Sequence, residues 1–237
     1  MLDYARSVLV DAVKRLGRRY GLEVSRYRPL SPRLVARLNE GIPVVYDVGA
    51  NRGQFALDLR EHGYAGEIVS FEPVRAAYVQ LVAASEHDAA WSHQQVALGG
   101  EEGEIEIHVT SNLASSSLLE MHDGHIAAAP SVTVERTETV RVVRLDTLVG
   151  GDTRPCMLKI DVQGFEDRVL DGAGETLKRT VLVECELSIA PLYDGQADFR
   201  VMIDRLDDAG FALVDLDPFF YDPADGRVLS VDAIFAR

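Results

Sequence analysis

The segment VVYDVGANRGQFAL, residues 44–57, decides the predicted fold. It opens with an apolar, β-branched run that is typical of a strand buried on both faces. Small residues then form a turn ahead of a predicted helix. The carboxyl ends of strands in an open α/β sheet bind ligands, and small residues there let backbone N–H groups approach one. The segment therefore predicts a ligand site, marked by Asp47 in the strand, Gly49, Asn51 and Gly53 in the turn, and Phe55 in the helix.

The glycine spacing narrows the kind of ligand. Residues 49–53 read Gly-Ala-Asn-Arg-Gly, without the third glycine of the dinucleotide pattern. That absence and the acid inside the strand favour a smaller cationic or zwitterionic ligand over a pyrophosphate. A plain tight turn is the alternative, because turns favour small residues without any ligand.

Length and composition favour one α/β domain. The chain has 237 residues, and 47% of them are hydrophobic, which suffices for one core. We find neither an apolar run of about 18 residues nor a secretory signal pattern, and expect no transmembrane helix and no export. Cys156 and Cys185 fall in predicted strands at an offset too large for a disulfide. Two buried thiols indicate a reducing compartment, so we expect a cytoplasmic protein.

The charge is distributed unevenly. A net charge of −14 argues against non-specific nucleic-acid binding, yet residues 1–37 hold nine Arg or Lys against three acids. Apolar residues at helical spacing predict a helix over 2–20 with a basic face, and a short helix over 32–39. This extension, residues 1–40, can lie on its own acidic domain, support a homodimer, or contact the inner face of a membrane through residues 1–22.

Strands and helices alternate through the remaining residues, 41–237. This pattern predicts a mostly parallel sheet with one antiparallel strand near its edge. The expected strands cover 44–48, 67–71, 91–98, 157–162, 181–187, 211–215 and 232–236, and the expected helices cover 53–62, 74–85, 164–178 and 197–209.

Residues 104–143 interrupt the alternation. The sequence EIEIHV, residues 104–109, alternates as a strand with one wet face does, and residues 132–143 again look extended. Between them, residues 110–131 are rich in Ser, Ala, Gly and His. We interpret 104–143 as a hairpin insertion that carries a lid or substrate loop, from which His122 and His125 could supply bases on closure.

Three further segments carry charged residues at predicted strand ends. Glu72 lies 25 residues past Asp47, where an acid can accept both hydroxyls of a ribose, and Pro73 would hold it at the rim. Lys159 and Asp161 share one face of an apolar strand, which is costly unless they pair or serve a ligand. The next strand holds two more acids. Of these we expect Glu184 to face the site and Glu186 to face the opposite side.

An ordered set of motifs resembles one known family. The set is VYDVGANRG, SFEP, VALG, SSSLL, LDTL, LKIDVQGFE, VLVECE and the closing DAIFAR. In this order and spacing, it resembles the FkbM family of S-adenosylmethionine-dependent methyltransferases from about residue 44 to residue 237. Gln163 departs from the pattern, since the family more often has Glu there, and residues 1–40 fall outside it.

The resemblance implies a fold and a cofactor. It implies a Rossmann-like class I methyltransferase sheet with strand order 3-2-1-4-5-7-6 and the last strand antiparallel. The cofactor is then S-adenosyl-L-methionine, with Glu72 on the ribose, Ala97 and Leu98 near the adenine, and Asp161 near the amino group or sulfonium. The expected cofactor-binding residues are Asp47, Gly49, Asn51, Gly53, Phe55, Glu72, Pro73, Ala97 and Asp161.

The implied reaction is O-methylation of a small molecule, most of all of a sugar in a glycolipid or secondary metabolite. An alcohol needs a base as it attacks, and Asp161 and Glu184 are the candidates, with Lys159 orienting a carboxylate or the acceptor oxygen. We expect no metal. Two alternatives stay open: an NAD-dependent oxidoreductase, since Glu72 also suits that ribose, and a non-catalytic membrane or partner-binding module that uses the basic helix.

Overall fold

The computed structural model describes residues 31–38 and 40–237. The predicted helix over 2–20 and its proposed contact surface lie outside the described residues. The compact unit begins at Ser31, ahead of the expected boundary at residue 41. Its first helix, α2 (Pro32–Leu38), buries Leu34, and Ser31 Oγ donates to Asp215 Oδ2 at 2.7 Å.

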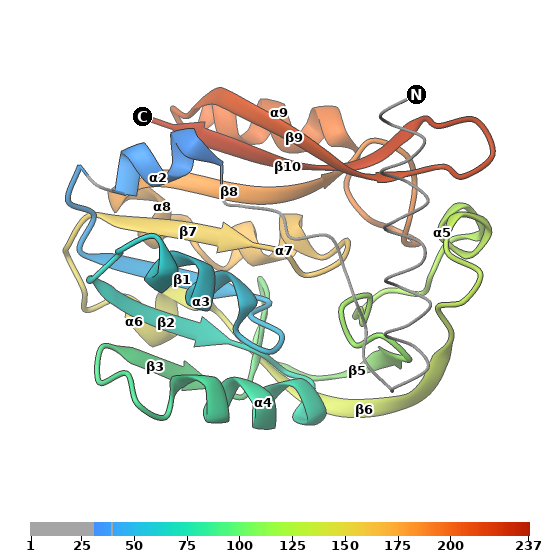
Figure 1. Cartoon of the computed structure of the whole chain (residues 1–237), viewed down its shortest axis with the longest axis horizontal. Helices are drawn as coiled ribbons and strands as arrows, with labels where there is room; N and C mark the ends of the chain where they lie inside the picture. Colours follow the sequence, from blue (N-terminus) through green and yellow to red (C-terminus); the bar gives the residue numbers. More distant parts are fainter. Residues whose placement is uncertain (1–30, 39) are drawn as a thin grey trace, which may run out of the picture. The chain divides into compact units, whose positions relative to one another are not determined.

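A seven-stranded sheet forms the centre of the unit (Figure 1). Its order is β3-β2-β1-β7-β8-β10-β9, and among these strands β10 alone runs in the direction opposite to the others. Numbered along the chain within this sheet, the order is 3-2-1-4-5-7-6, as the family resemblance implied. The strands are β1 (Val44–Val48), β2 (Glu67–Phe71), β3 (Trp91–Gln94), β7 (Cys156–Ile160), β8 (Thr180–Ser188), β9 (Ala212–Tyr221) and β10 (Val228–Ala236).

A second sheet of three strands holds the insertion. The antiparallel hairpin of β5 (Gly103–Thr110) and β6 (Val134–Val143) confirms the hairpin prediction. The single strand expected over 91–98 is wrong, because the chain changes sheets within it. Trp91–Gln94 pairs with β2, whereas β4 (Ala97–Leu98) pairs with the end of β6, where Ala97 packs into a separate apolar cluster.

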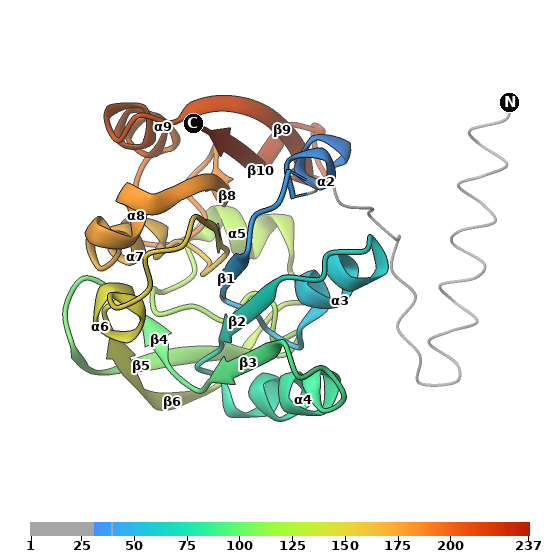
Figure 2. The same cartoon turned by 90° about the vertical axis from the view of Figure 1, so that its left-hand side faces the viewer.

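Helices cover both faces of the large sheet (Figure 2). The helices α2, α3 (Gln54–Glu61) and α4 (Arg75–Ser85) lie on one face, and α6 (Leu145–Val149), α7 (Glu166–Asp171), α8 (Gly174–Arg179) and α9 (Phe199–Asp208) lie on the other. Within the insertion, α5 (Asp123–Ala128) is one short helix.

The single helix predicted over 164–178 is wrong. It breaks at Gly172, where a Cβ atom would lie 2.1 Å from the carbonyl oxygen of Gly99. Asp146 then caps the second piece, α8, by accepting from the backbone N–H groups of Glu175 and Thr176 at 2.9 and 2.8 Å. Close backbone contact and a long-range cap thus divide a helix that looks continuous in the sequence.

The central strands are buried throughout. All five residues of β1 and all five of β7 are buried, as expected of strands covered on both faces. Cys156 pairs in register with Thr180, and Cys185 with Ile160, so the predicted offset between the two free, buried thiols is confirmed. Among the described residues, no helix is both long and apolar enough to cross a membrane.

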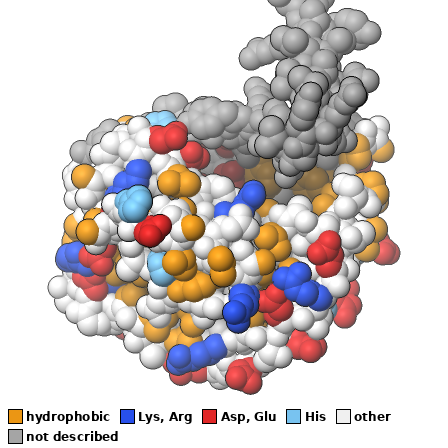
Figure 3. All heavy atoms as spheres, turned by 60° about the horizontal axis from the view of Figure 1, so that its bottom comes forward, with side chains coloured by type: hydrophobic (Ala, Val, Ile, Leu, Met, Phe, Trp, Pro, Cys, Tyr) orange, Lys and Arg blue, Asp and Glu red, His pale blue; other side chains and the backbone are white. Residues whose placement is uncertain are grey.

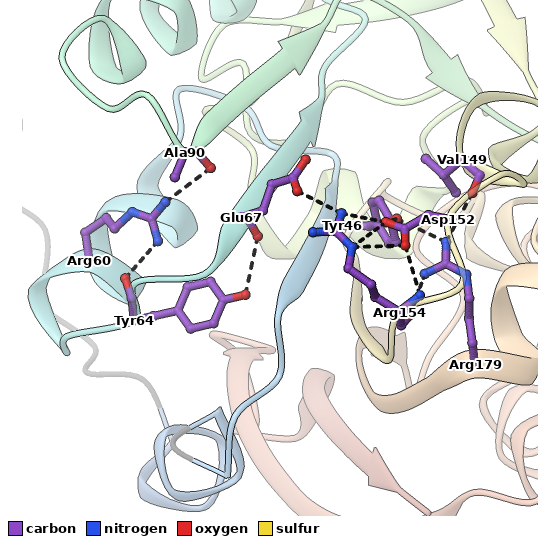
Figure 4. Close-up of polar contacts among 9 residues, drawn as sticks. All are labelled: Tyr46, Arg60, Tyr64, Glu67, Ala90, Val149, Asp152, Arg154 and Arg179. Atoms are coloured by element: carbon purple, nitrogen blue, oxygen red, sulfur yellow. Dashed lines mark hydrogen bonds and ion pairs between the residues drawn. The ribbon is translucent and has the colours of Figure 1, made fainter.

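Polar contacts tie the amino ends of the strands together (Figure 4). Arg154 donates to Asp152 at 2.7 Å and to Glu67 at 2.8 Å, while the Tyr46 hydroxyl donates to Asp152 and accepts from Arg179, each at 3.0 Å. Burial raises the pKa of Tyr46 to about 12, so this hydroxyl stays neutral. These contacts stabilise the amino-terminal ends of the strands, on the side of the sheet away from the candidate site.

The surface over α4 and β6 carries mixed charge. Figure 3 shows basic, acidic and apolar side chains interspersed on this face. Arg136 and Glu138 of β6 form an ion pair at 2.6 Å. The same two elements also expose apolar side chains, namely Val79 and Val82 of α4 and Val134 of β6. Acidic and basic side chains therefore alternate on this face and do not gather into a patch of one sign.

Candidate active site

A cavity of about 320 Å³ opens at the carboxyl ends of β1, β2, β7 and β8. It lies at the point where the strand order reverses, between β1 and β7, which is where open α/β sheets bind ligands. Its walls come from the glycine turn, the end of β2, the segments after β3 and β7, the β8–β10 pair and the insertion. The predicted residues that line it are Gly49, Asn51, Phe55, Glu72, Pro73, Ala97, Leu98, Lys159, Asp161 and Glu184.

The glycine turn fits against the end of β7. Gly49 has a φ of +75°, and a Cβ atom there would lie 1.8 Å from the carbonyl oxygen of Asp161. Gly53, at φ +86°, has no room for a Cβ atom beside the Trp91 ring, 2.8 Å away. Gly53 does not line the cavity, and it packs beneath the turn.

Lys159 connects the turn to the sheet. Its buried Nζ atom donates to the Gly49 carbonyl oxygen at 2.9 Å and lies 3.2 Å from Asp47 Oδ1 and 3.6 Å from Asp161 Oδ2. Desolvation acts to lower the pKa of Lys159, but the surrounding carboxylates outweigh it and raise this pKa above its usual value. The residue therefore carries a permanent charge that both pairs with acids and fixes the turn.

Asp47 lies beneath the cavity. Its side chain is fully buried, accepts from Ser70 Oγ at 3.1 Å, and is not part of the cavity wall. A buried ion pair was one of the two roles expected for Lys159, and Lys159 forms such a pair with Asp47. Asp47 thus holds Lys159, which in turn holds Gly49.

Glu72 is held rigidly at the rim of the sheet. Its Oε2 accepts from the backbone N–H of Asn51 and its Oε1 from that of Val74, both at 2.8 Å. Burial raises the pKa of Glu72 to about 7, although both backbone hydrogen bonds oppose the rise. Each oxygen keeps a lone pair, so the carboxylate can still accept from two hydroxyls of a ligand.

Four carboxyl groups gather at the other end of the cavity. Asp161 follows β7, Glu184 and Glu186 lie on β8, and Asp232 lies on β10 directly opposite Glu186. The expectation that Glu186 faces away is wrong, because residues two apart on a strand share one face. Sequence reasoning missed Asp232, although an acid inside an apolar strand was its signal.

These carboxyl groups differ in their protonation. Burial acts to raise the pKa of Asp161, but Lys159 and hydrogen bonds from Glu186 and Gln163 outweigh it and hold this pKa below its usual value. Burial raises the pKa of Glu184 to about 8, and the nearby Asp232 adds to the rise. Glu184 Oε2 is buried without a hydrogen-bond partner among the described residues. Glu184 is thus the acid of this group that is poised to exchange a proton near neutral pH.

The insertion supplies the remaining wall, but not through its histidines. His122 Nδ1 accepts from the Gly124 backbone N–H at 3.1 Å at the start of α5. His125 is buried against the rings of Tyr193 and Phe220. Neither histidine lines the cavity, so neither is placed as a base. The loop residues that do line it are Leu113, Ala114, Ser116 and Leu118.

Residues 47–213 match the methyltransferase FkbM domain. The chain belongs to the FkbM methyltransferase family. The family's cofactor is S-adenosyl-L-methionine, which decides against the nicotinamide cofactor that Glu72 also suited. The chain is also similar to the 2-O-methyltransferase NoeI of Sinorhizobium fredii, with 25% identity over 181 residues, 73% of this chain and 74% of that protein.

A solved structure of an FkbM methyltransferase shares the fold. The methyltransferase FkbM from Methylobacillus flagellatus superposes with a TM-score of 0.51 at 12% identity, over 82% of this chain. This chain covers 43% of that one, and the likeness concerns the fold alone.

The residues of the cavity fit the cofactor of the family. S-adenosylmethionine carries a ribose, an amino acid group and a positive sulfonium. Glu72 offers lone pairs to hydroxyls, and the carboxyl groups near Asp161 suit positive charge. The Asn51 side-chain oxygen is buried without a hydrogen-bond partner among the described residues, as expected of a group that awaits a donor.

Proposed function

We propose that this protein methylates a hydroxyl group of a small molecule, with a sugar of a glycolipid or secondary metabolite as the acceptor class. The observation that carries the proposal is Glu184. Its Oε2 is buried and has no hydrogen-bond partner among the described residues, its pKa is about 8, and it shares a cavity with the glycine turn and Glu72. In its ionised form, a carboxylate with this pKa can accept the proton that an attacking alcohol releases.

The cofactor end of the cavity is proposed at the turn and the rim of β2. Gly49 and Asn51 would hold the amino acid part, Glu72 the ribose, and Ala97 the adenine, with Phe55 and Pro73 beside them. Asp161 would face the amino group or sulfonium. Asp47 and Gly53 support this end from beneath, through Lys159 and through the close packing on Trp91.

The catalytic roles follow from the state of each side chain. When bound, the cofactor supplies a methyl group that its sulfonium has already activated. The protein must align the acceptor oxygen and remove its proton. Glu184 suits the base because its pKa lies near neutral pH, whereas the lowered pKa of Asp161 makes Asp161 a weaker base. Lys159 orients Asp161 and the turn.

A hydroxylated, uncharged acceptor suits the other walls. Leu113 and Leu118 offer apolar contact, and Ser116, Glu186 and Asp232 offer polar groups. Hydroxyls can donate to the carboxyl groups, and the apolar residues can contact the C–H face of a sugar ring. The Sinorhizobium fredii relative is a 2-O-methyltransferase, which supports oxygen as the acceptor atom.

The basic N-terminal residues bear on where the enzyme meets its acceptor. Nine Arg or Lys among residues 1–37 suit an anionic surface, so a lipid-linked sugar at the inner membrane face is the proposed form. A homodimer through the same extension is the alternative. Liposome co-sedimentation of the full chain and of a chain lacking residues 1–22 separates them; equal pelleting of both would remove the membrane contact.

The test of the reaction is a mass-spectrometric screen of free sugars and glycolipids for the gain of one methyl group. The wild type should methylate an acceptor, and the Glu184→Gln variant should bind S-adenosylhomocysteine normally while losing most of the transfer. Transfer to nitrogen or carbon acceptors alone would overturn the proposal.

A further inference from the structure

Gln163 links the carboxyl groups of the candidate site to the loop that lines the same cavity. Its amide nitrogen donates to Asp161 Oδ1 at 2.8 Å and to Glu186 Oε2 at 2.5 Å. Its amide oxygen accepts from the Tyr193 hydroxyl at 2.7 Å, and its backbone carbonyl accepts from Ser117 Oγ at 2.6 Å. Both amide hydrogens have acceptors, so the orientation of the amide is determined.

The backbone at this point is bent to bring these partners together. Gln163 has a φ of +58° and Gly164 a φ of +96°, two consecutive residues in the left-handed region. A residue other than glycine is uncommon there and persists where its surroundings hold it. A Cβ atom on Gly164 would lie 2.9 Å from the Tyr193 Cβ, so the same bend seats Tyr193 against the backbone.

The partners on the other side belong to residues 113–118, which we call the wall segment. It supplies four lining residues to the cavity. Ser117 exchanges two backbone hydrogen bonds with His108 of β5, at 2.8 and 3.2 Å. The Tyr193 hydroxyl also lies 3.4 Å from the Ser115 carbonyl oxygen. Gln163 therefore reaches the wall segment twice, directly at Ser117 and through Tyr193.

Only a side-chain amide satisfies the contacts with Asp161, Glu186 and Tyr193 together, whereas the contact with Ser117 uses the backbone carbonyl. A leucine at position 163 would fill similar volume without donating or accepting. A carboxylate would accept from Tyr193, but it would face Asp161 and Glu186 without a hydrogen to donate. A protonated carboxyl group has one donor and one acceptor, and so could replace part of the bridge. The titratable groups around this position are Asp161, Glu166 of α7, Glu186, Asp232 and Tyr193.

We propose that Gln163 is a positioning residue that couples the wall segment to the Asp161–Glu186 carboxyl pair, so that the acceptor end of the cavity is closed through its amide. The link to the acceptor rests on the proposed function. The coupling itself belongs to the unliganded chain, and it can be measured without cofactor or acceptor.

Hydrogen–deuterium exchange of peptides covering 113–119 tests the coupling, in full-length wild type and in Gln163→Leu, Gln163→Glu and Tyr193→Phe variants. We expect roughly tenfold faster exchange of these amides in Gln163→Leu at every pH, the effect of losing about one to two hydrogen bonds. Gln163→Glu should exchange as fast at pH 8, and regain protection at acidic pH as the new carboxyl group protonates. Each variant is compared with the wild type at the same pH.

Two comparisons keep the result specific. Peptides covering 44–48 report on the sheet and should be unchanged. Tyr193→Phe removes the hydroxyl through which the Gln163 amide reaches the wall segment, so it should loosen that segment at least as much as Gln163→Leu. The proposal would be overturned if residues 113–119 exchanged at the wild-type rate in both Gln163→Leu and Tyr193→Phe. It would also be overturned if Gln163→Glu did not regain protection at acidic pH. If the exchange behaves as expected but no hydroxyl acceptor is methylated, the proposed function fails while the coupling stands.

Discussion

The Cα of Gly49 faces the carbonyl oxygen of Asp161, so closely that a Cβ atom would lie 1.8 Å from it. This contact brings the end of β1 against the end of β7, the two strands that flank the switch point. The Lys159 side chain reinforces the contact by donating to the Gly49 carbonyl oxygen. The two most informative motifs of the sequence therefore meet backbone to backbone.

Gly49→Ala should destabilise the protein by about 3 kcal/mol or more, because the added methyl group meets backbone atoms that cannot move aside. The matched control is Gly63→Ala. Gly63 also has a positive φ, +87°, but no atom of the described residues lies within 4 Å of its Cβ position. That variant should cost only about 1 kcal/mol of backbone strain. Urea unfolding measures both, and equal losses would contradict the contact.

Lys159→Met should destabilise the fold by about 3–5 kcal/mol, because it leaves Asp47 as an uncompensated buried charge. Asp47→Asn in the same chain should restore part of the loss. Denaturant unfolding of the two single variants and the double variant gives the coupling energy. Additive losses would show that the pair does not act as a unit.

Glu72→Gln should weaken S-adenosylhomocysteine binding at least about tenfold, since an amide can no longer accept from both Asn51 and Val74. Glu67→Gln is the control, because Glu67 lies on the same strand at the opposite edge of the sheet and bonds to Arg154 there. Isothermal titration calorimetry measures both affinities. Equal affinity in Glu72→Gln and wild type would remove the ribose role.

Glu184→Gln should change how stability depends on pH. The folded-state pKa of Glu184, about 8, exceeds the usual value of 4.5, so the folded state binds this proton more tightly than the unfolded state. In the wild type, the contribution of Glu184 to the free energy of unfolding is fully present below pH 4.5 and is lost as the pH rises through 8. Relative to wild type, the variant should be unchanged near pH 4 and gain on the order of 1–3 kcal/mol by pH 9. Unfolding curves at both pH values give the difference, and a gain that is equal at both would contradict the raised pKa.

The methyl-transfer rate should rise with pH and level off above about 8, because the base acts in its ionised form. Glu184→Gln should lower kcat by about 10²–10⁴-fold and remove this limb of the profile. Asp161→Asn should leave the limb in place while lowering the rate. A pH profile that survives in Glu184→Gln would transfer the role of base to another group.

Local pattern was enough to predict most elements and one end of the site. The apolar run that opens β1, the turn after it and the acid at the end of β2 are each visible within a few residues. Parallel strands bring their carboxyl ends to one edge, so Gly49, Glu72 and Asp161 could be expected at one cavity. The hairpin of β5 and β6 was likewise visible in its period of two.

What the sequence by itself determined was therefore the alternation of elements and the edge of the sheet that binds ligand, because periodicity and turn chemistry are local. Only the tertiary structure decided that Asp47 lies beneath the site, that Gly99 splits α7 from α8, and that Asp232 joins Glu184. Each of these depends on atoms from segments far apart in the chain. Their contacts arise from sheet register and backbone approach, which no local pattern contains.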